Sequence, residues 1–359
     1  MSSKKQLEVL RDQIDEIDGK LLDLLNLRAG VALKVSEFKQ KNAFKVYDPV
    51  REKQVLQKIK SLNSGPLSSD LVKSVFKQII SVCRAIQKPI ALTVLGPKGS
   101  YSHQVATRIL GMSVSINPVV TIEDVFIDVE KGKNLFGVVP VENSAEGSVA
   151  NVLDKFLDTD LKICTEYYER ISHSLLSRSG NIDDIKVVAS HPQAIGQCRK
   201  WLSRRFNNVD YKETSSTARA AQLASENEHI AAIAGEFNTS IYDLKIVESS
   251  IEDYPNNTTR FFLIGYQDNR PSGSDKTSIV FSLKDEPGAL SSALLPFDNE
   301  NINLTKIESR PTRKKSWEYV FFVDFEGHSS ENLVQEVLGN VSKSCIFLKI
   351  LGSYPKGKV

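Results

Sequence analysis

The sequence of 359 residues lacks several features that would assign it to a special class of protein. Its four cysteines lie far apart and show no cysteine or histidine spacing typical of a metal site, so neither a disulfide framework nor a zinc centre is predicted. With 46 basic and 44 acidic residues, no excess charge calls for nucleic acid as a partner. No apolar run approaches the ~20 residues of a membrane span and no signal peptide is recognisable, which predicts a cytoplasmic protein.

The length is too great for one core and predicts two to three domains. The first of these, residues 1–89, has the pattern of three helices. Asp48 and Pro49 form the N-cap and first turn of the second helix, which runs to about Leu62, and the third helix begins near Asp70 and ends before Pro89. Apolar residues recur every three or four positions before them, which predicts one helix of more than thirty residues. This apolar stripe consists of Leu7, Leu10, Ile14, Ile17, Leu21, Leu24, Val31, Val35 and Phe38.

Arg28 falls within the apolar stripe of this long helix. A buried guanidinium is costly unless an anion meets it, so a carboxylate partner or a bound ligand is required. Lys39 lies about 20° away around the helix and roughly 16 Å along it, so both cations can converge on one small dianion. Arg11 lies roughly 25 Å from Arg28 and could join them only from a second chain alongside. A long helix with one apolar side needs such a partner.

The segments LRDQID, LLNLRAG, KVSEFK, YDPVRE and SVCRAIQ resemble, in sequence and spacing, the all-helical chorismate mutases. In that family the dimer exchanges the long helix, so that each site takes one arginine from the other subunit. The resemblance implies a chorismate site made of Arg11, Arg28, Lys39, Asp48, Arg51, Glu52, Cys83 and Gln87.

In this site Arg11 of a second chain and Arg28 would clamp carboxylates, with Arg51 in support. Lys39 and Gln87 would be the catalytic donors to the ether oxygen, and Glu52 would meet the substrate hydroxyl. The rearrangement of chorismate to prephenate is concerted, so it needs positioning and charge stabilisation but no cofactor. Because Gln87 is a neutral amide where some relatives carry glutamate, we expect mutase activity that does not rise on acidification from neutral pH.

In the second part, residues 90–267, short apolar strands alternate with helices, which predicts a parallel α/β sheet. The loop Gly96–Ser100 lacks the spacing of a P-loop and can be a plain turn. Ligands in open α/β sheets bind at the carboxyl ends of strands, so polar residues there are expected to line one cleft. These residues are Glu142, Asn143, Ser144, His191 and Ser216. Taken alone, Glu142 could be a solvated loop acid and His191 a helix N-cap.

The stretch from Tyr254 to Gly265 begins as a polar loop and continues into an apolar run typical of a buried strand. Thr258, Thr259 and Arg260 place two hydroxyls and a permanent charge at its start, which suits an anionic substrate that carries a hydroxyl. Threonine in a strand and a solvent-facing arginine are also ordinary, so an unspecialised strand is the alternative.

Together with LGPKGSYSHQVA, GVVPVENSAEGSV, SHPQAIGQC and STARAA, this stretch resembles the prephenate dehydratases, whose two lobes enclose the substrate as periplasmic binding proteins do. The resemblance implies that Thr259 is catalytic and assists departure of the ring hydroxyl, with Glu142 and His191 as further candidates for the proton source. Arg260 could bind a carboxylate or brace the loop. The implied prephenate site consists of Glu142, Asn143, Ser144, His191, Ser216, Thr259 and Arg260.

The C-terminal part, residues 276–355, follows a linker rich in proline, glycine and serine, and its order βαββαβ predicts a ferredoxin-like sandwich. DEPGALSSAL and the ESRP segment resemble the ACT regulatory domain. The basic run Arg313–Lys315 fits a solvated hairpin tip better than a nucleic-acid contact. The resemblance implies that L-phenylalanine contacts Gly288, Ala289, Leu290, Glu308, Ser309, Arg310 and Pro311.

The three resemblances together predict a multidomain enzyme of the bifunctional chorismate mutase/prephenate dehydratase family. It would combine an all-α mutase unit, a two-lobed α/β dehydratase domain and an α+β regulatory domain. Its ligands would be chorismate, prephenate and L-phenylalanine, with no cofactor or metal and no nucleic-acid or membrane partner, and it would form a homodimer or a larger homo-oligomer.

Three alternatives stay open at this point. Two α/β lobes could merely capture a solute, although no export signal supports a periplasmic protein. An amino-acid-responsive DNA-binding regulator would need a helix-turn-helix or a basic stripe, and the sequence has neither. The third alternative keeps the fold and has lost one of the two activities.

Overall fold

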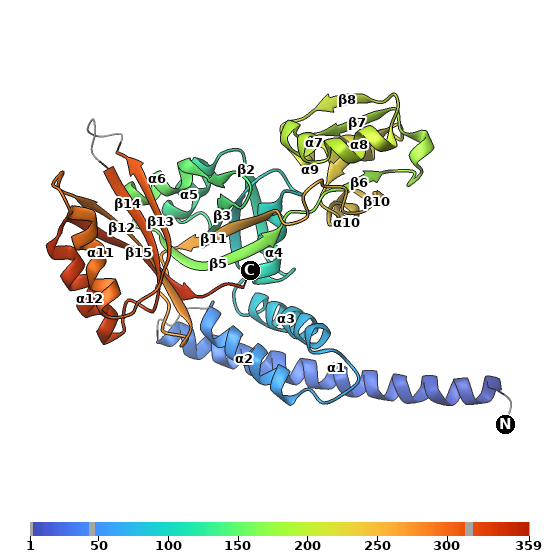
Figure 1. Cartoon of the computed structure of the whole chain (residues 1–359). Coiled ribbons are helices and arrows are strands. Elements are labelled where there is room, and N and C mark those ends of the chain that lie inside the picture. The colour runs from blue at the N-terminus through green and yellow to red at the C-terminus, as the bar shows by residue number, and fades with distance from the viewer. Residues whose placement is uncertain (1–2, 43–46, 313–318, 359) are drawn as a thin grey trace. The chain divides into compact units, whose positions relative to one another are not determined.

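A computed structural model describes residues 3–42, 47–312 and 319–358, so the basic run Arg313–Lys315 lies outside the described residues. The chain divides into two compact units. Unit 1 comprises Met1–Ile90 with Leu110–Ser115, and unit 2 comprises Ala91–Ile109 with Ile116–Val359 (Figure 1). Within the described ranges, no helix has both the length and the apolar character needed to cross a membrane.

Unit 1 contains the three predicted helices, α1 (Ser3–Lys41), α2 (Pro49–Leu62) and α3 (Ser69–Ala85). The Asp48 side chain accepts a hydrogen bond from the Arg51 backbone N–H at 2.9 Å, as predicted for the N-cap of α2. Such a cap is worth about 0.5–2 kcal/mol. The third helix was predicted to continue almost to Pro89 and to include Gln87, but α3 ends at Ala85 and the backbone continues in a turn.

The apolar stripe of α1 is exposed along the helix. Leu10, Ile17, Leu24 and Phe38 keep 53%, 54%, 61% and 61% of their surface accessible, and Ser36 is the one buried residue of α1 among those described. Covering the exposed half of such a side chain contributes on the order of 1 kcal/mol. The described part of the chain therefore supplies little apolar cover for this helix.

The first sheet of unit 2 was predicted to be parallel, but it is mixed. Strands β1 and β3 run parallel, whereas β11 is antiparallel to both of its neighbours, β3 and β5. Short β4 (Gly147–Ser148) pairs with β3 to make a hairpin. In order across the sheet, the other strands are β2 (Ser115–Val119), β1 (Ala91–Leu95), β3 (Phe136–Asn143), β11 (Thr258–Gly265) and β5 (Lys162–Arg170). The helices between them are α4 (Tyr101–Leu110), α5 (Ile122–Glu130) and α6 (Ala150–Asp158).

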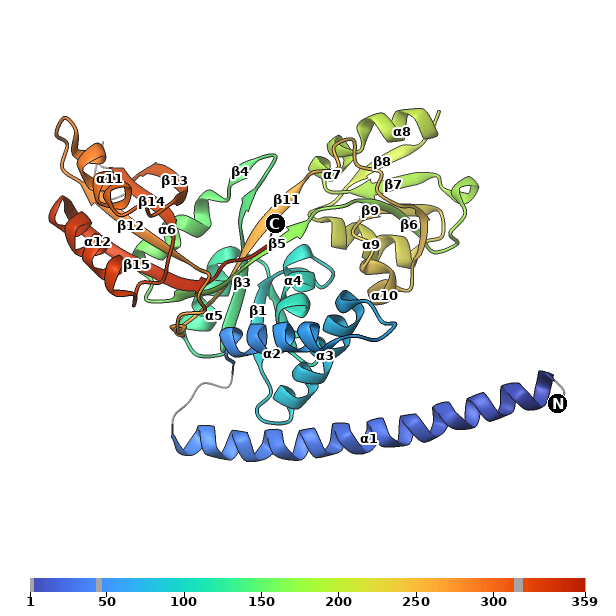
Figure 2. The same cartoon turned by 60° about the horizontal axis from the view of Figure 1, so that its bottom comes forward.

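The second sheet forms another lobe of unit 2 and is also mixed. Strand β7 runs parallel to β8 and β9, and β6 is antiparallel to β9 and β10. The chain passes between the lobes twice, from β5 to β6 and from β10 to β11 (Figure 2). Its strands, in order, are β10 (Lys245–Glu248), β6 (Ser174–Ser177), β9 (Ile230–Ala234), β7 (Val187–Ser190) and β8 (Asp210–Glu213). The helices of this lobe are a short 3-10 helix (Ile182–Asp184), α7 (Pro192–Gln197), α8 (Arg199–Arg205), α9 (Thr217–Glu226) and α10 (Asn238–Tyr242).

The third sheet confirms the predicted βαββαβ order, with the antiparallel arrangement β13-β14-β12-β15. Buried side chains of both helices pack on one face of this sheet. The elements are β12 (Asp275–Leu283), α11 (Ala289–Asn299), β13 (Leu304–Pro311), β14 (Tyr319–Glu326), α12 (Asn332–Lys343) and β15 (Cys345–Pro355).

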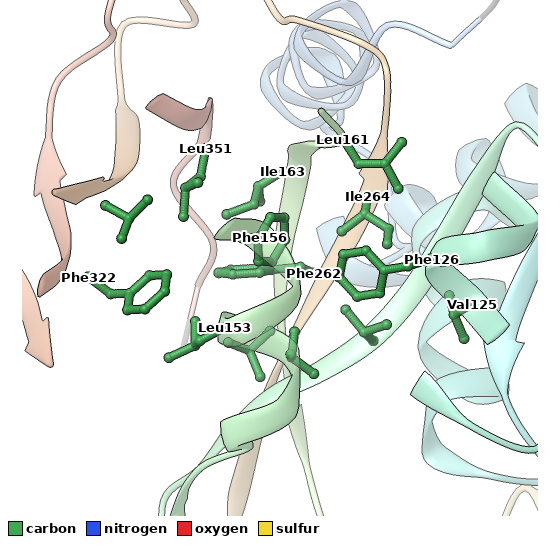
Figure 3. Close-up of a cluster of buried hydrophobic side chains, with 14 of the residues drawn as sticks. Val125, Phe126, Leu153, Phe156, Leu161, Ile163, Phe262, Ile264, Phe322 and Leu351 are labelled. Carbon is green, nitrogen blue, oxygen red and sulfur yellow. The ribbon is translucent and has the colours of Figure 1, made fainter. Parts of the chain in front are cut away.

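The opposite face of the third sheet shares a core with the first sheet (Figure 3). Phe322 and Leu351 of the third sheet belong to the same buried cluster as Leu153, Phe156 and Phe262. Phe262 lies on β11, two residues after Arg260. Apolar packing therefore fixes the third sheet directly against the strand that carries Thr259 and Arg260.

Candidate active sites

Thr259 lies at the start of β11, is 7% exposed and has a defined hydrogen-bond partner. Asn143 Nδ2 donates to Thr259 Oγ1 at 2.8 Å and to Asn257 Oδ1 at 2.7 Å. The Thr259 hydroxyl thus accepts a hydrogen bond, and none of the described residues accepts its own proton. This arrangement leaves the Thr259 O–H available to donate to a bound ligand.

Ser144 is tied to the backbone of the strand that it faces. The Thr258 N–H donates to Ser144 Oγ at 2.9 Å, and the Ser144 N–H donates to the Thr258 carbonyl at 2.8 Å. Ser144 Oγ also donates to the Asn256 carbonyl at 3.3 Å. The Ser144 hydroxyl therefore holds the loop that precedes Thr259 in place.

Glu169 is a candidate site residue that the sequence did not indicate. It lies directly opposite Thr259 in the β5–β11 pairing, so the two side chains share one face of the sheet. Burial raises the pKa of Glu169, against the opposing effect of Arg108, whose Nε lies 3.2 Å from the carboxylate. Only the pairing of two strands that are distant in sequence brings this acid to Thr259, and no local pattern signals it.

In the second lobe, His191 and Ser216 are both helix N-caps. His191 Nδ1 accepts from the Gln193 N–H at 3.4 Å, and Ser216 Oγ accepts from the Arg219 N–H at 3.1 Å. The N-cap alternative for His191 is thus confirmed. Among the described residues neither side chain contacts Thr259. Contacts between the lobes include a hydrogen bond from Gln193 Nε2 to Glu146 and one from Tyr242 Oη to the Lys98 carbonyl at 2.6 Å.

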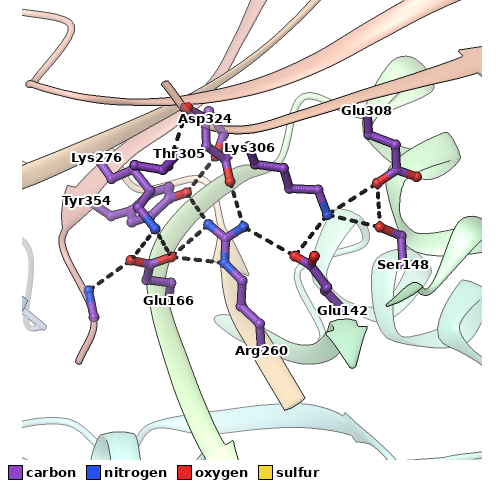
Figure 4. Close-up of polar contacts among 12 residues, drawn as sticks. Glu142, Ser148, Glu166, Arg260, Lys276, Thr305, Lys306, Glu308, Asp324 and Tyr354 are labelled. Carbon is purple, nitrogen blue, oxygen red and sulfur yellow. Dashed lines mark hydrogen bonds and ion pairs between the residues drawn. The ribbon is translucent and has the colours of Figure 1, made fainter. Parts of the chain in front are cut away.

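Arg260 points away from Thr259, since neighbouring side chains of a strand alternate between faces. It is 4% exposed, and its guanidinium donates to Glu166 at 2.9 Å, Asp324 at 2.5 Å and Tyr354 Oη at 3.1 Å (Figure 4). Burial acts to lower the pKa of Arg260, but the surrounding Tyr354, Asp324 and Glu166 raise it overall. The guanidinium donors of Arg260 are therefore taken up by other protein groups. This favours a structural, bracing role for Arg260 over binding of a substrate carboxylate.

The sequence had suggested that Glu142 could lie in a loop, but it lies within β3. It stands opposite Arg260 in the strand pairing, and its carboxylate accepts from Lys306 Nζ at 2.9 Å. A cavity of about 280 Å³ opens here between the first and third sheets. The cavity is lined by Glu142, Ser144, Tyr168, Thr258, Arg260, Lys276, Thr305, Lys306 and Asp324.

The predicted prephenate residues therefore form three groups. Asn143 and Thr259 share one face of the first sheet, because they are directly paired. Glu142, Ser144 and Arg260 line the cavity next to the third sheet. The remaining two, at the N-termini of α7 and α9, lie in the second lobe.

In unit 1, Glu52 is paired with Arg84, a buried residue that the sequence prediction missed. Burial raises the pKa of Glu52, with Arg84 opposing the shift. The Arg84 guanidinium also lies over the Tyr47 ring, 5.4 Å from its centroid. Because Arg84 is a cation on the buried side of α3, the reasoning applied to Arg28 could have found it.

The other predicted chorismate residues lie on all three helices or just beyond them. Cys83 is buried on α3, and the Gln87 carbonyl accepts from Ser36 Oγ at 3.5 Å. Arg28 and Lys39 are half-buried on α1, whereas Arg51 is exposed. Arg11 and Arg28 stand on one straight helix seventeen residues apart, roughly 25 Å along its axis. One chain therefore does not bring these two arginines together.

The predicted phenylalanine residues occupy two places in the third sheet region. Gly288 is the N-cap of α11, in a left-handed conformation (φ 81°) that favours glycine. On β13, Ser309 and Pro311 are exposed, whereas Glu308 and Arg310 turn toward the first sheet. Arg310 Nε lies 2.8 Å from Asp154, and Ser148 donates to Glu308. Among the described residues, no hydrogen bond or ion pair joins the Gly288 and Glu308 segments.

Comparison with known families shows three matches in succession along the chain. Residues 10–88 match chorismate mutase type II, residues 92–269 match prephenate dehydratase, and residues 277–342 match the ACT domain. A bifunctional chorismate mutase/prephenate dehydratase of Aquifex aeolicus is 44% identical over 356 residues, covering 98% of both chains. The chain belongs to the bifunctional chorismate mutase/prephenate dehydratase family. A second member, from Pseudomonas aeruginosa, is 43% identical over 99% of both chains.

The chain also resembles a solved structure of a prephenate dehydratase. A prephenate dehydratase from Arthrobacter aurescens, in complex with L-Phe, is 32% identical with a TM-score of 0.68. The match covers 74% of this chain and 90% of that one. The family thus carries both enzymatic activities, and the predicted order of helical mutase, two-lobed dehydratase and ACT domain is confirmed.

Proposed function

We propose that Thr259 is the catalytic residue of the dehydratase, in a domain spanning residues 90–267. The observation that carries this assignment is the hydrogen bond from Asn143 to Thr259 Oγ1. When prephenate loses carbon dioxide, the electrons of the broken carbon–carbon bond make the ring aromatic and expel the ring hydroxyl. The Thr259 O–H donates to that departing oxygen and limits its developing charge, and the leaving group ends as water.

The residues around Thr259 support this chemistry in different ways. Asn143 orients the threonine, and Ser144 fixes the loop before it. Burial raises the pKa of Glu169, which shares the face of the sheet with Thr259, so its carboxyl group is placed to return the proton that the hydroxyl gives up. His191 and Ser216 of the second lobe would reach the substrate when the lobes close around it, while Arg260 and Glu142 tie this domain to the regulatory domain.

We further propose that the mutase, residues 1–89, works as a homodimer that exchanges α1. Arg28, Lys39 and Gln87 of one chain would meet Arg11 of the other, with Asp48, Arg51, Glu52 and Cys83 completing the chorismate site. The exposed apolar stripe of α1 supports this arrangement, since a second copy of the helix would cover it. A cytoplasmic location stays a prediction from the sequence.

The regulatory domain, residues 276–355, is proposed to bind L-phenylalanine with Gly288–Leu290 and Glu308–Pro311. Since β13 is an edge strand, the two segments could complete one site across an interface between two chains. Phenylalanine inhibits turnover if it binds one arrangement of the dimer more tightly than the other. The L-Phe complex of the Arthrobacter aurescens dehydratase supports the choice of this ligand.

Saturating L-phenylalanine should suppress formation of phenylpyruvate from prephenate by the intact protein. The rate should fall about 5-fold to 150-fold, the range typical of allosteric coupling. The measurement is the initial rate against phenylalanine concentration, with D-phenylalanine as the matched control that should have a much smaller effect. Unchanged dehydratase rates at saturating L-phenylalanine would refute the regulatory assignment.

A further inference from the structure

The hairpin of β3 and β4, here called the catalytic hairpin (residues 142–148), is contacted by three parts of unit 2. Its Asn143 holds Thr259, and its Glu146 accepts a hydrogen bond from Gln193 of the second lobe. At its base, Glu142 and Ser148 stand opposite each other in the strand pairing and contact the third sheet. A movement of this hairpin would therefore reach both the catalytic threonine and one of the contacts between the lobes.

Lys306 of β13, in the regulatory domain, forms hydrogen bonds with both strands of the catalytic hairpin. Its ammonium donates to Glu142 Oε2 and to Ser148 Oγ, each at 2.9 Å (Figure 4). It also forms an ion pair with Glu308 at 3.2 Å. These three contacts match the three N–H donors of a lysine ammonium. Together they connect the hairpin to the ESRP segment, residues 308–311.

The surroundings of Lys306 make this contact hard to replace. Its side chain is 14% exposed, and it lies between the carboxylates of Glu142 and Glu308. Burial acts to raise the pKa of Glu308, but the hydrogen bond from Ser148 and the charge of Lys306 outweigh it and lower the pKa overall. Without the ammonium, Glu142 and Glu308 would keep only Arg260 at 4.0 Å and Arg310 at 3.4 Å as cationic partners, and the repulsion between the two carboxylates would increase.

We propose that Lys306 is a positioning residue of the dehydratase, which holds the catalytic hairpin so that Asn143 keeps Thr259 in place. Because Lys306 also pairs with Glu308, a ligand that draws the ESRP segment away would loosen the hairpin and slow turnover. Lys306 thereby makes dehydratase turnover depend on the regulatory domain. The inference rests on the proposed function, since it assumes catalysis by Thr259 and inhibition by L-phenylalanine.

Replacing Lys306 with methionine tests this role, because methionine keeps an unbranched chain without the charge. We expect kcat for prephenate to fall at least about tenfold while KM changes little, since small misplacements of catalytic groups cost up to about 10²-fold. Saturating L-phenylalanine should inhibit this variant about tenfold less than the wild type, a loss of one typical allosteric coupling, while calorimetry should give nearly unchanged binding of phenylalanine. Lys306→Arg should recover most of both properties.

Lys349→Met is the matched control. Lys349 also extends from the regulatory domain to the dehydratase, but its ammonium donates to the carbonyls of Phe156 and Thr159, away from the hairpin. This variant should keep wild-type turnover and inhibition. Mutase turnover should stay unchanged in all three variants, and unchanged binding of phenylalanine would show that the regulatory domain is folded.

Unchanged kcat or unchanged inhibition in Lys306→Met would overturn the inference, and so would equal losses in Lys349→Met. If Lys306→Met does not fold, Glu142→Gln removes the same ion pair from its other end and should weaken inhibition by phenylalanine. Wild-type inhibition in Glu142→Gln would likewise overturn it. Failure of the proposed function is a different result, because the wild-type protein itself would then show no turnover of prephenate or no response to phenylalanine.

Discussion

Replacing Thr259 with alanine should lower kcat of the dehydratase by about 10²-fold to 10⁴-fold, the range for loss of a proton donor or a stabilising hydrogen bond in the transition state. The hydroxyl is held by Asn143, and alanine offers nothing in its place. Mutase turnover should stay near normal, because the residues proposed to bind chorismate lie in unit 1. The two rates are measured separately, as prephenate formed from chorismate and phenylpyruvate formed from prephenate.

Two further variants sharpen this experiment. Thr259→Ser keeps the hydroxyl and should retain part of the activity. Thr258→Ala changes the neighbouring residue, whose side chain lines the cavity on the other face of the sheet, and should cost little. Near-normal turnover in Thr259→Ala would contradict the catalytic assignment, whereas loss of both activities would mean that the two enzymes depend on each other.

Arg11→Ala and Arg28→Ala should each abolish most mutase activity, and a mixture of the two chains should regain about a quarter of the wild-type rate. Random pairing makes half of the dimers mixed, and each mixed dimer has one site with both arginines and one with neither. The mixture is prepared by co-expression or by refolding the two variants together. Recovery on mixing is the measured result, followed as formation of prephenate.

Two controls accompany the mixing experiment. Each variant refolded alone should stay inactive as a mutase, and dehydratase turnover should remain near normal in every sample. An inactive mixture that nevertheless contains mixed dimers would show that Arg11 and Arg28 do not share a site between chains, and the proposed exchange of α1 would be wrong.

Local patterns in the sequence predicted the elements well where a single segment determines them. The apolar spacing of α1, the cap at Asp48 and the buried run of β11 all appear in the structure at the expected residues. Parallel pairing was predicted correctly for β1 with β3 and for β7 with its neighbours, but wrongly for β11, because alternation of strands and helices favours parallel pairing. Strand β11 comes back from the other lobe and inserts beside β3 in the antiparallel direction, and no local pattern encodes that.

In the candidate dehydratase site, too, the sequence predicted features set by one segment and missed those set by distant segments. The sequence singled out Thr259 through its motif, and Asn143 was placed among the substrate contacts without its link to the threonine. Glu169 and Lys306 were missed, since each reaches the site through pairing or packing between segments far apart in the chain. Arg260 was left with two alternatives, and only its partners in the third sheet distinguish them.

Incubating the purified full-length protein with chorismate tests most directly whether one chain carries both reactions. Chorismate, prephenate and phenylpyruvate are followed in the same sample over time. We expect chorismate to disappear, prephenate to rise transiently and phenylpyruvate to accumulate, and added L-phenylalanine should leave prephenate as the main product. Unchanged chorismate, or prephenate that accumulates without phenylpyruvate when no phenylalanine is present, would contradict a bifunctional enzyme.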